Sequence, residues 1–113
     1  MKKIEIVTRP EKFKELKDRL YEIGIGGMTV TEAAGTGKQK GKQGLFRGTT
    51  FEIEVLPKLK IELVVDDVQV DEIVSIILET CDTGSIGDGK IFIMPVEEAI
   101  RIRTGETGRK AIL

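Results

Sequence analysis

The chain has 113 residues, a formal net charge of −1 and 33% charged residues, a composition that fits one soluble domain with no global attraction to nucleic acid. It has no histidine and one cysteine, which excludes a Cys/His zinc site and an intramolecular disulfide and removes the commonest catalytic base. Because it shows neither a signal-peptide pattern nor an apolar run long enough to span a bilayer, we expect a cytoplasmic protein.

The first part of the chain predicts a strand, a helix and a second strand. Residues 3–8 alternate in polarity, as in a half-buried strand. Pro10 suits the first turn of a helix and Gly24 its end. An apolar stripe at helical spacing lies between them: Phe13, Leu16, Leu20 and Ile23. Residues 28–33 follow as the second strand.

Two further strands and a second helix are expected next. Residues 51–55 return from a long loop, and residues 58–65 alternate cleanly, with Lys58, Glu62 and Val64 on one face.

The second helix begins after an acidic pair, since Asp66 or Asp67 can cap it. Its apolar stripe is Val70, Ile73, Val74, Ile77 and Cys81. A cysteine in such a stripe is interpreted as a buried structural thiol.

Residues 91–96 predict a last core strand, and residues 100–103 a short final strand. The order of elements, βαββαβ, predicts an α+β, ferredoxin-like domain over residues 1–113, with two helices on one face of an antiparallel sheet. The other face carries Val64 and other apolar positions, so we expect self-association to cover it.

The glycine-rich stretch 83–92, Thr-Gly-Ser-Ile-Gly-Asp-Gly-Lys-Ile-Phe, is typical of an anion-binding loop, because its backbone N–H groups can converge while Lys90 adds charge. It matches the G-x-x-x-x-G-K part of a P-loop, but Ile91 stands where a magnesium-binding hydroxyl is required. A P-loop also runs from strand to helix, whereas this loop runs from helix to strand. The stretch therefore predicts a phosphate site unlike that of an ordinary NTPase.

A long basic loop covers about residues 37–55, with no acidic residue between Glu32 and Glu52. A loop this long in a small domain is either functional or disordered. Phe46 beside Arg47 gives its tip an apolar anchor next to a planar cation, a pairing that interfaces favour. A solvated, flexible hairpin tip is the alternative.

Arg101 and Arg103 share one face of the expected final strand, because side chains alternate along a strand. Two guanidinium groups at this spacing suit a polyphosphate. Alone they would be read as surface salt bridges. Together with the glycine-rich loops they favour a nucleotide.

Five motifs, in order along the chain, resemble the PII nitrogen-signalling family nearly end to end. They are residues 27–31 (Gly-Met-Thr-Val-Thr), 37–41 (Gly-Lys-Gln-Lys-Gly), 56–58 (Leu-Pro-Lys), 83–92, and 100–106 (Ile-Arg-Ile-Arg-Thr-Gly-Glu). The resemblance implies a homotrimeric regulator rather than an enzyme, with an ATP or ADP site in each cleft between subunits.

The resemblance also implies a set of ligand-binding residues. Those for ATP or ADP are Thr29, Gly35, Gly37, Lys38, Glu62, Val64, Gly87, Asp88, Gly89, Lys90 and, from the neighbouring subunit, Arg101 and Arg103. Gln39 is similar to the residue that joins Mg-ATP to 2-oxoglutarate, and Lys58 to the lysine that pairs with a carboxylate of 2-oxoglutarate. Different ligands would then hold the long loop in different shapes.

Family targets include ammonium transporters, nitrogen-metabolism enzymes and transcription factors, and membrane contact would come only through such a partner. Arg47 matches the family's loop-tip arginine, and Phe46 lies beside it. Phe51 replaces the tyrosine that many members uridylylate, so that modification is chemically impossible here. Thr49 occupies the place of a serine that some members phosphorylate, although a threonine there is more often an ordinary loop residue.

Four alternatives remain open from the sequence. They are a nucleotide-binding regulator of energy state without 2-oxoglutarate, a weak ATPase using Asp88, Glu62 or Glu106, a ferredoxin-like RNA-binding domain, and a trimer without a ligand. Against an ATPase, the chain lacks the P-loop hydroxyl. Against an RNA-binding domain, its expected strands carry few aromatic residues beyond Phe92.

Overall fold

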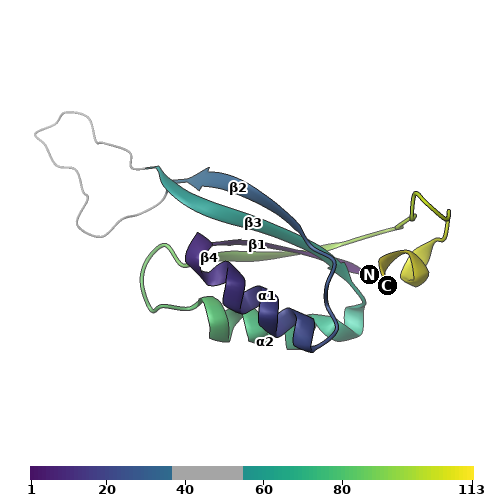
Figure 1. Cartoon of the computed structure of the whole chain (residues 1–113), viewed down its shortest axis with the longest axis horizontal. Coiled ribbons are helices and arrows are strands. Elements are labelled where there is room, and N and C mark those ends of the chain that lie inside the picture. The colour runs from purple at the N-terminus through teal and green to yellow at the C-terminus, as the bar shows by residue number, and fades with distance from the viewer. Residues whose placement is uncertain (37–54) are drawn as a thin grey trace, which may run out of the picture.

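The computed structural model describes residues 1–36 and 55–113, and the four strands within them form one antiparallel sheet in the order β2-β3-β1-β4 (Figure 1). The elements are β1 (Lys2–Thr8), α1 (Phe13–Glu22), β2 (Thr29–Gly35), β3 (Leu56–Val65), α2 (Val70–Cys81) and β4 (Gly89–Pro95). The predicted ferredoxin-like order is confirmed. Of the returning arm expected over 51–55, only Val55 lies among the described residues.

Helix α1 forms where the apolar stripe predicted it. Pro10 opens a single 3-10 turn that leads into the helix, because its fixed φ suits a first turn and its missing N–H is not needed there. Leu16 and Leu20 are fully buried, and each such side chain contributes about 1.5–3 kcal/mol of transfer free energy. Gly24 follows the helix with a φ of +87°, which confirms it as the stop.

Helix α2 is entered through a capping box, in which Asp66 accepts a backbone N–H and the Gln69 side chain accepts the Asp66 N–H in return. The structure thus selects Asp66 rather than Asp67 as the cap. The buried face is broader than predicted, since α2 packs against both α1 and the sheet. Ile76 and Thr80 join it, and Arg19 of α1 donates a 3.0 Å hydrogen bond to the Thr80 hydroxyl.

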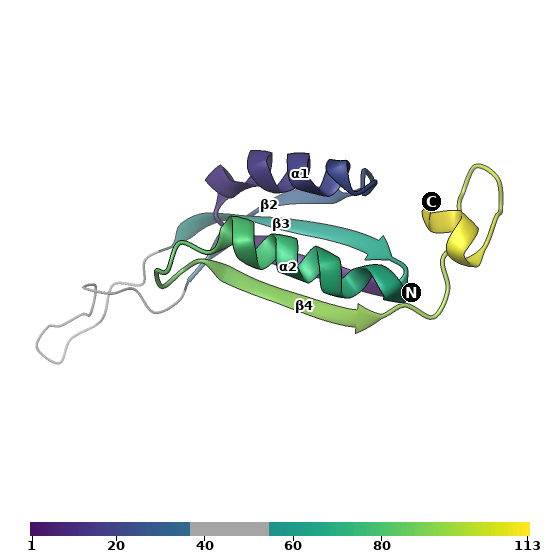
Figure 2. The same cartoon turned by 90° about the horizontal axis from the view of Figure 1, so that it is seen from below.

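Both helices lie on the same face of the sheet (Figure 2). The core between them and the sheet consists of twelve buried residues: Ile4, Ile6, Leu16, Leu20, Ile25, Ile61, Leu63, Val65, Ile73, Ile76, Ile77 and Cys81. Within residues 1–36 and 55–113, no helix has the length and apolar character needed to cross a membrane.

The opposite face of the sheet carries a ladder of charges. Glu5 of β1 lies directly opposite Glu62 of β3, a like-charged pair that is unfavourable by itself. Lys3 and Lys60 relieve it, because Lys3 Nζ lies 2.6 Å from a Glu62 oxygen and Lys60 Nζ lies 3.5 Å from Glu5. The Lys3 ammonium accordingly lowers the pKa of Glu62.

The prediction of a short strand over residues 100–103 is wrong. Only Ile100 forms a bridge, to Thr107, and the chain then reverses. Gly105, with a φ of +73°, donates its N–H to the Arg101 carbonyl at 2.8 Å. A glycine that adopts this conformation without strain allows a tight turn where the alternating pattern alone suggested a strand. Arg101 and Arg103 therefore do not lie on one strand face.

Candidate functional site

The loop between α2 and β4 is organised around one carboxylate. Asp88 accepts hydrogen bonds from the N–H groups of Thr83 at 2.7 Å and Gly84 at 3.1 Å, and from the Thr83 hydroxyl. The Thr83 hydroxyl and N–H hold the pKa of Asp88 well below its usual range, because they stabilise the ionised form. Asp88 therefore shapes the turn in which it lies.

Arg9 is a site residue that the sequence reasoning missed. Its Nε–H donates to Asp88 Oδ1 at 3.0 Å, and its Nη2 donates to the Ile86 carbonyl at 3.0 Å. The signal lies in the strand order rather than in the local sequence, because β1 and β4 pair antiparallel with Thr8 opposite Gly89. The residue after the first strand must then lie beside the loop before the last strand.

Two glycines give the loop its path. Gly87 and Gly89 have φ values of +100° and +112°, a region that L side chains rarely adopt. A Cβ atom at Gly89 would lie 1.7 Å from the Val7 carbonyl oxygen, closer than any real contact. Only glycine fits at position 89, because the β1 backbone passes directly beside it.

Lys58 joins this loop to the base of the segment 37–54. Its Nζ donates a hydrogen bond to the Gly87 carbonyl, and its Cγ lies 3.4 Å from where a Cβ of Gly35 would stand. The structure therefore brings Lys58, Gly35 and Gly87 together beside the start of β3. Three predicted site residues from three different elements meet there.

The charge at this end of the sheet favours an anion. Lys90 is an exposed residue of β4 and shares its face with Phe92, since Ile91 between them packs on the core. The Asp88 carboxylate is already saturated by donors, including Arg9. Lys58 and Lys90 therefore give the loop a positive end.

Thr29, Glu62 and Val64 lie at the far end of the β2–β3 pair. Thr29 is opposite Glu62, whereas Gly35 is opposite Leu56. Gly35 lies six positions after Thr29 along the strand, a distance of roughly 20 Å. One ligand could contact both groups of residues only in an extended conformation.

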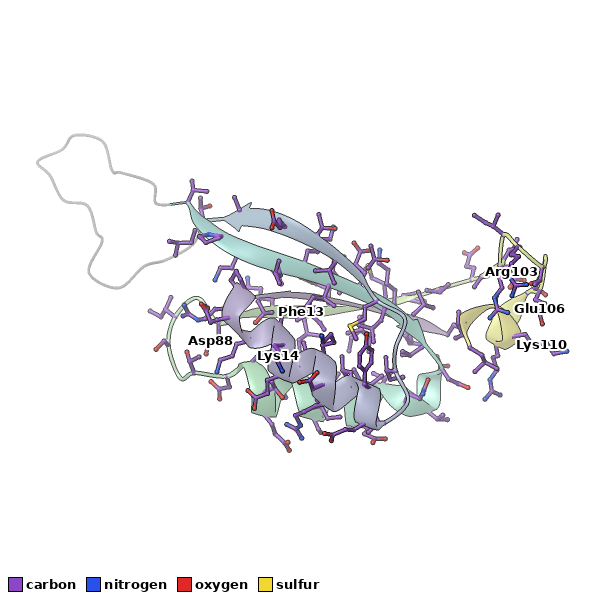
Figure 3. The ribbon with its side chains drawn as sticks, viewed as in Figure 1. Phe13, Lys14, Asp88, Arg103, Glu106 and Lys110 are labelled. Atoms are coloured by element: carbon purple, nitrogen blue, oxygen red, sulfur yellow. The ribbon has the colours of Figure 1, made fainter. Side chains whose placement is uncertain are left out.

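Arg101 and Arg103 are not brought to the loop within one chain. Figure 3 labels Asp88 at one end of the sheet and Arg103 beyond the other end. Arg101 is held there by its own chain, with Nη1 2.9 Å from a Glu106 oxygen.

Seven predicted residues lie outside the described part of the chain. They are Gly37, Lys38, Gln39, Phe46, Arg47, Thr49 and Phe51.

Comparison with known proteins gives the fold a family. A family model described as nitrogen regulatory protein P-II matches residues 1–106. The chain is 54% identical to a nitrogen regulatory protein P-II of Rhodospirillum rubrum, covering 99% of this chain and all of that protein. It is also 52% identical to nitrogen regulatory protein P-II 2 of Methanothermobacter thermautotrophicus, over 99% of this chain and 97% of that one. The chain belongs to the P-II family.

Two solved P-II structures share its architecture. Bacillus subtilis GlnK superposes with a TM-score of 0.82 and 44% identity, covering 97% of this chain and 96% of that one. Arabidopsis thaliana PII bound to citrate superposes with a TM-score of 0.79 and 38% identity, covering 98% and 88%. The resemblance to the P-II family is thus confirmed. This is a family of nitrogen regulatory proteins, which are regulators rather than enzymes.

Proposed function

We propose that this P-II protein, a single domain over residues 1–113, senses ATP or ADP and 2-oxoglutarate and passes the signal to nitrogen-metabolism targets. The observation that carries the proposal is the meeting of Lys58, Gly35 and Gly87 at the base of the segment 37–54. A ligand bound there would contact β3, the glycine loop and the end of β2 at the same time.

The glycine loop supplies the phosphate-binding half of the site. Gly87 and Gly89 give the loop backbone the positive φ values that it needs to turn, and Lys90 adds a positive charge. Arg103 lies at the opposite end of the molecule from Asp88 (Figure 3), and Arg101, two residues before it, is paired with Glu106, so both would reach these phosphates only from a second copy. The proposed assembly is a cyclic homotrimer with one nucleotide in each cleft.

The base and sugar would extend along β2 and β3 toward Thr29, Glu62 and Val64. Their distance from the loop suits an extended nucleotide rather than a small anion. Gly37, Lys38 and Gln39 would complete the site, with Gln39 contacting magnesium through Mg-ATP.

Lys58 is the proposed partner of a 2-oxoglutarate carboxylate. Its ammonium now binds the Gly87 carbonyl, a neutral acceptor, and a carboxylate is a stronger acceptor for it. The citrate bound to the Arabidopsis relative supports a carboxylate effector.

The output would be carried by residues 37–55, whose base the ligands touch. Ligands shift a conformational equilibrium only by binding one state better than another, and here ADP and Mg-ATP with 2-oxoglutarate would make different contacts at Lys58 and Gln39. Phe46 and Arg47 would contact the target, such as an ammonium transporter. Because Phe51 has no hydroxyl for uridylylation, we propose control by ligands alone, and a stoichiometric phosphoryl adduct at Thr49 in native cells would contradict it.

Calorimetric titration tests the proposal. ATP and ADP should bind to wild type, and 2-oxoglutarate should bind only with Mg-ATP present. Lys58→Met should remove 2-oxoglutarate binding, whereas Lys14→Met, at an exposed lysine of α1, should preserve it. Nucleotide binding without any 2-oxoglutarate response would leave a sensor of energy state, and no nucleotide binding would overturn the proposal.

A further inference from the structure

The guanidinium group of Arg101 is already occupied by its own chain. Nη1 donates to Glu106 Oε1 at 2.9 Å, and Nη2 donates to the backbone oxygens of Lys110 at 3.0 Å and Leu113 at 2.8 Å. These are the two outer nitrogens, which form the fork that binds a carboxylate or phosphate with two parallel hydrogen bonds. Both protons of Nη2 are used.

The segment that holds Arg101 is itself fixed to the protein. Thr104 donates its hydroxyl to Glu106 Oε1 at 2.9 Å, and Arg109 forms an ion pair with Asp66, the cap of α2. The Gly108 N–H donates to Glu98 Oε1 at 3.0 Å. Glu106 is therefore held beside Arg101 by a turn that hydrogen bonds and an ion pair fix to the rest of the protein.

Arg103, two residues away, differs from Arg101. Its side chain is exposed and forms no ion pair with any residue in the described ranges 1–36 and 55–113. Of the two arginines expected to bind the phosphates, Arg103 is exposed, whereas Arg101 is occupied by hydrogen bonds to its own chain. The Glu106 carboxylate and two backbone oxygens occupy the donor positions of Arg101 that phosphate oxygens would need.

We propose that residues 104–113 act as an internal competitor for the nucleotide phosphates at Arg101. Nucleotide would displace Glu106 and the backbone oxygens of Lys110 and Leu113 from the guanidinium group and so release the segment. By linkage, any partner that captures the released segment raises nucleotide affinity by the same factor. The proposal rests on the proposed function, because it needs Arg101 to bind phosphate.

The test compares Glu106→Gln with Glu97→Gln. Both remove one negative charge from the same region, and Glu97 is exposed and makes no ion pair with a described residue. Glu106→Gln should bind ADP about two- to fivefold more tightly than wild type, as expected for loss of a partly exposed ion pair. Glu97→Gln should match wild type.

A second measurement uses limited proteolysis, first without nucleotide and then with saturating ADP. Trypsin can cleave after Arg109 and Lys110, and mass spectrometry follows the loss of the residues beyond. Glu106→Gln should lose them faster than wild type, and saturating ADP should accelerate the loss from wild type.

The outcomes separate the two proposals. Suppose that wild type binds ADP but Glu106→Gln binds it no more tightly, or loses its last residues to trypsin no faster than wild type. The proposal of an internal competitor is then wrong, while the proposed nucleotide sensor is unaffected. If neither protein binds ADP, both are overturned. Tighter binding in both glutamate variants would point to general electrostatics and also overturn the competitor.

Discussion

The Nε atom of Arg9 lies 3.0 Å from Oδ1 of Asp88, so the end of β1 holds the turn that precedes β4. The same guanidinium group binds the Ile86 carbonyl. Arg9 is thus a positioning residue for the glycine loop, although it lies 79 residues from Asp88 in the chain.

Replacing Arg9 should weaken nucleotide binding without unfolding the protein. In Arg9→Gln the Asp88 turn loses its support from β1, and we expect ADP affinity to fall by about two- to tenfold, as for loss of a partly exposed charged hydrogen bond. Calorimetry measures the change, and Lys14→Gln serves as the control. Unchanged affinity in Arg9→Gln would show that the loop keeps its shape without β1.

Gly89→Ala should be severely destabilising. Its Cβ would meet the Val7 carbonyl at 1.7 Å, so the β1–β4 pairing must shift, and we expect a loss of about 3 kcal/mol or more in the free energy of unfolding. Gly84→Ala is the matched control, because Gly84 also has a positive φ, +78°, but open space around it. That variant should lose only about 1–2 kcal/mol. Urea unfolding measures both, and equal losses would mean that backbone conformation rather than the close contact decides.

Asp88 should make stability depend on pH in the acid range. Its pKa is lowered in the folded protein, chiefly by the Thr83 hydroxyl, so its contribution is present above the unfolded pKa of about 3.9 and is lost as pH falls through the folded value. Wild type should therefore exceed Asp88→Asn in unfolding free energy at pH 7, and the gap should narrow below about pH 4. A gap that stays constant down to pH 2 would show that the ionised carboxylate is not what matters.

Cys81 should react slowly with alkylating reagents. Burial raises the pKa of its thiol, and its side chain is 6% exposed, so both the thiolate fraction and access are low. Iodoacetamide labelling followed by mass spectrometry should be many times slower in native protein than in urea at the same pH. Equal rates would indicate that α2 opens readily at its end.

The strands and helices were predictable because their patterns are local. The alternation in β3 and the stripes of α1 and α2 follow directly from residues that bury against the core. The short final strand failed because Gly105 permits a reversal whose hydrogen bonds no alternation reveals.

The candidate site was only partly predictable for a related reason. The glycine loop is contiguous in sequence, so its residues could be found by composition. The contacts of Arg9 with Asp88 and of Lys58 with Gly87 join positions far apart along the chain, and they required the strand order.

The charge ladder on the open sheet face has a consequence for symmetry. Lys3 and Lys60 balance Glu5 and Glu62, two positive charges against two negative ones. The centre of the face is therefore electrically neutral, and an identical face approaching it meets no net repulsion. Several copies of the chain can therefore pack these sheet faces together around a common symmetry axis.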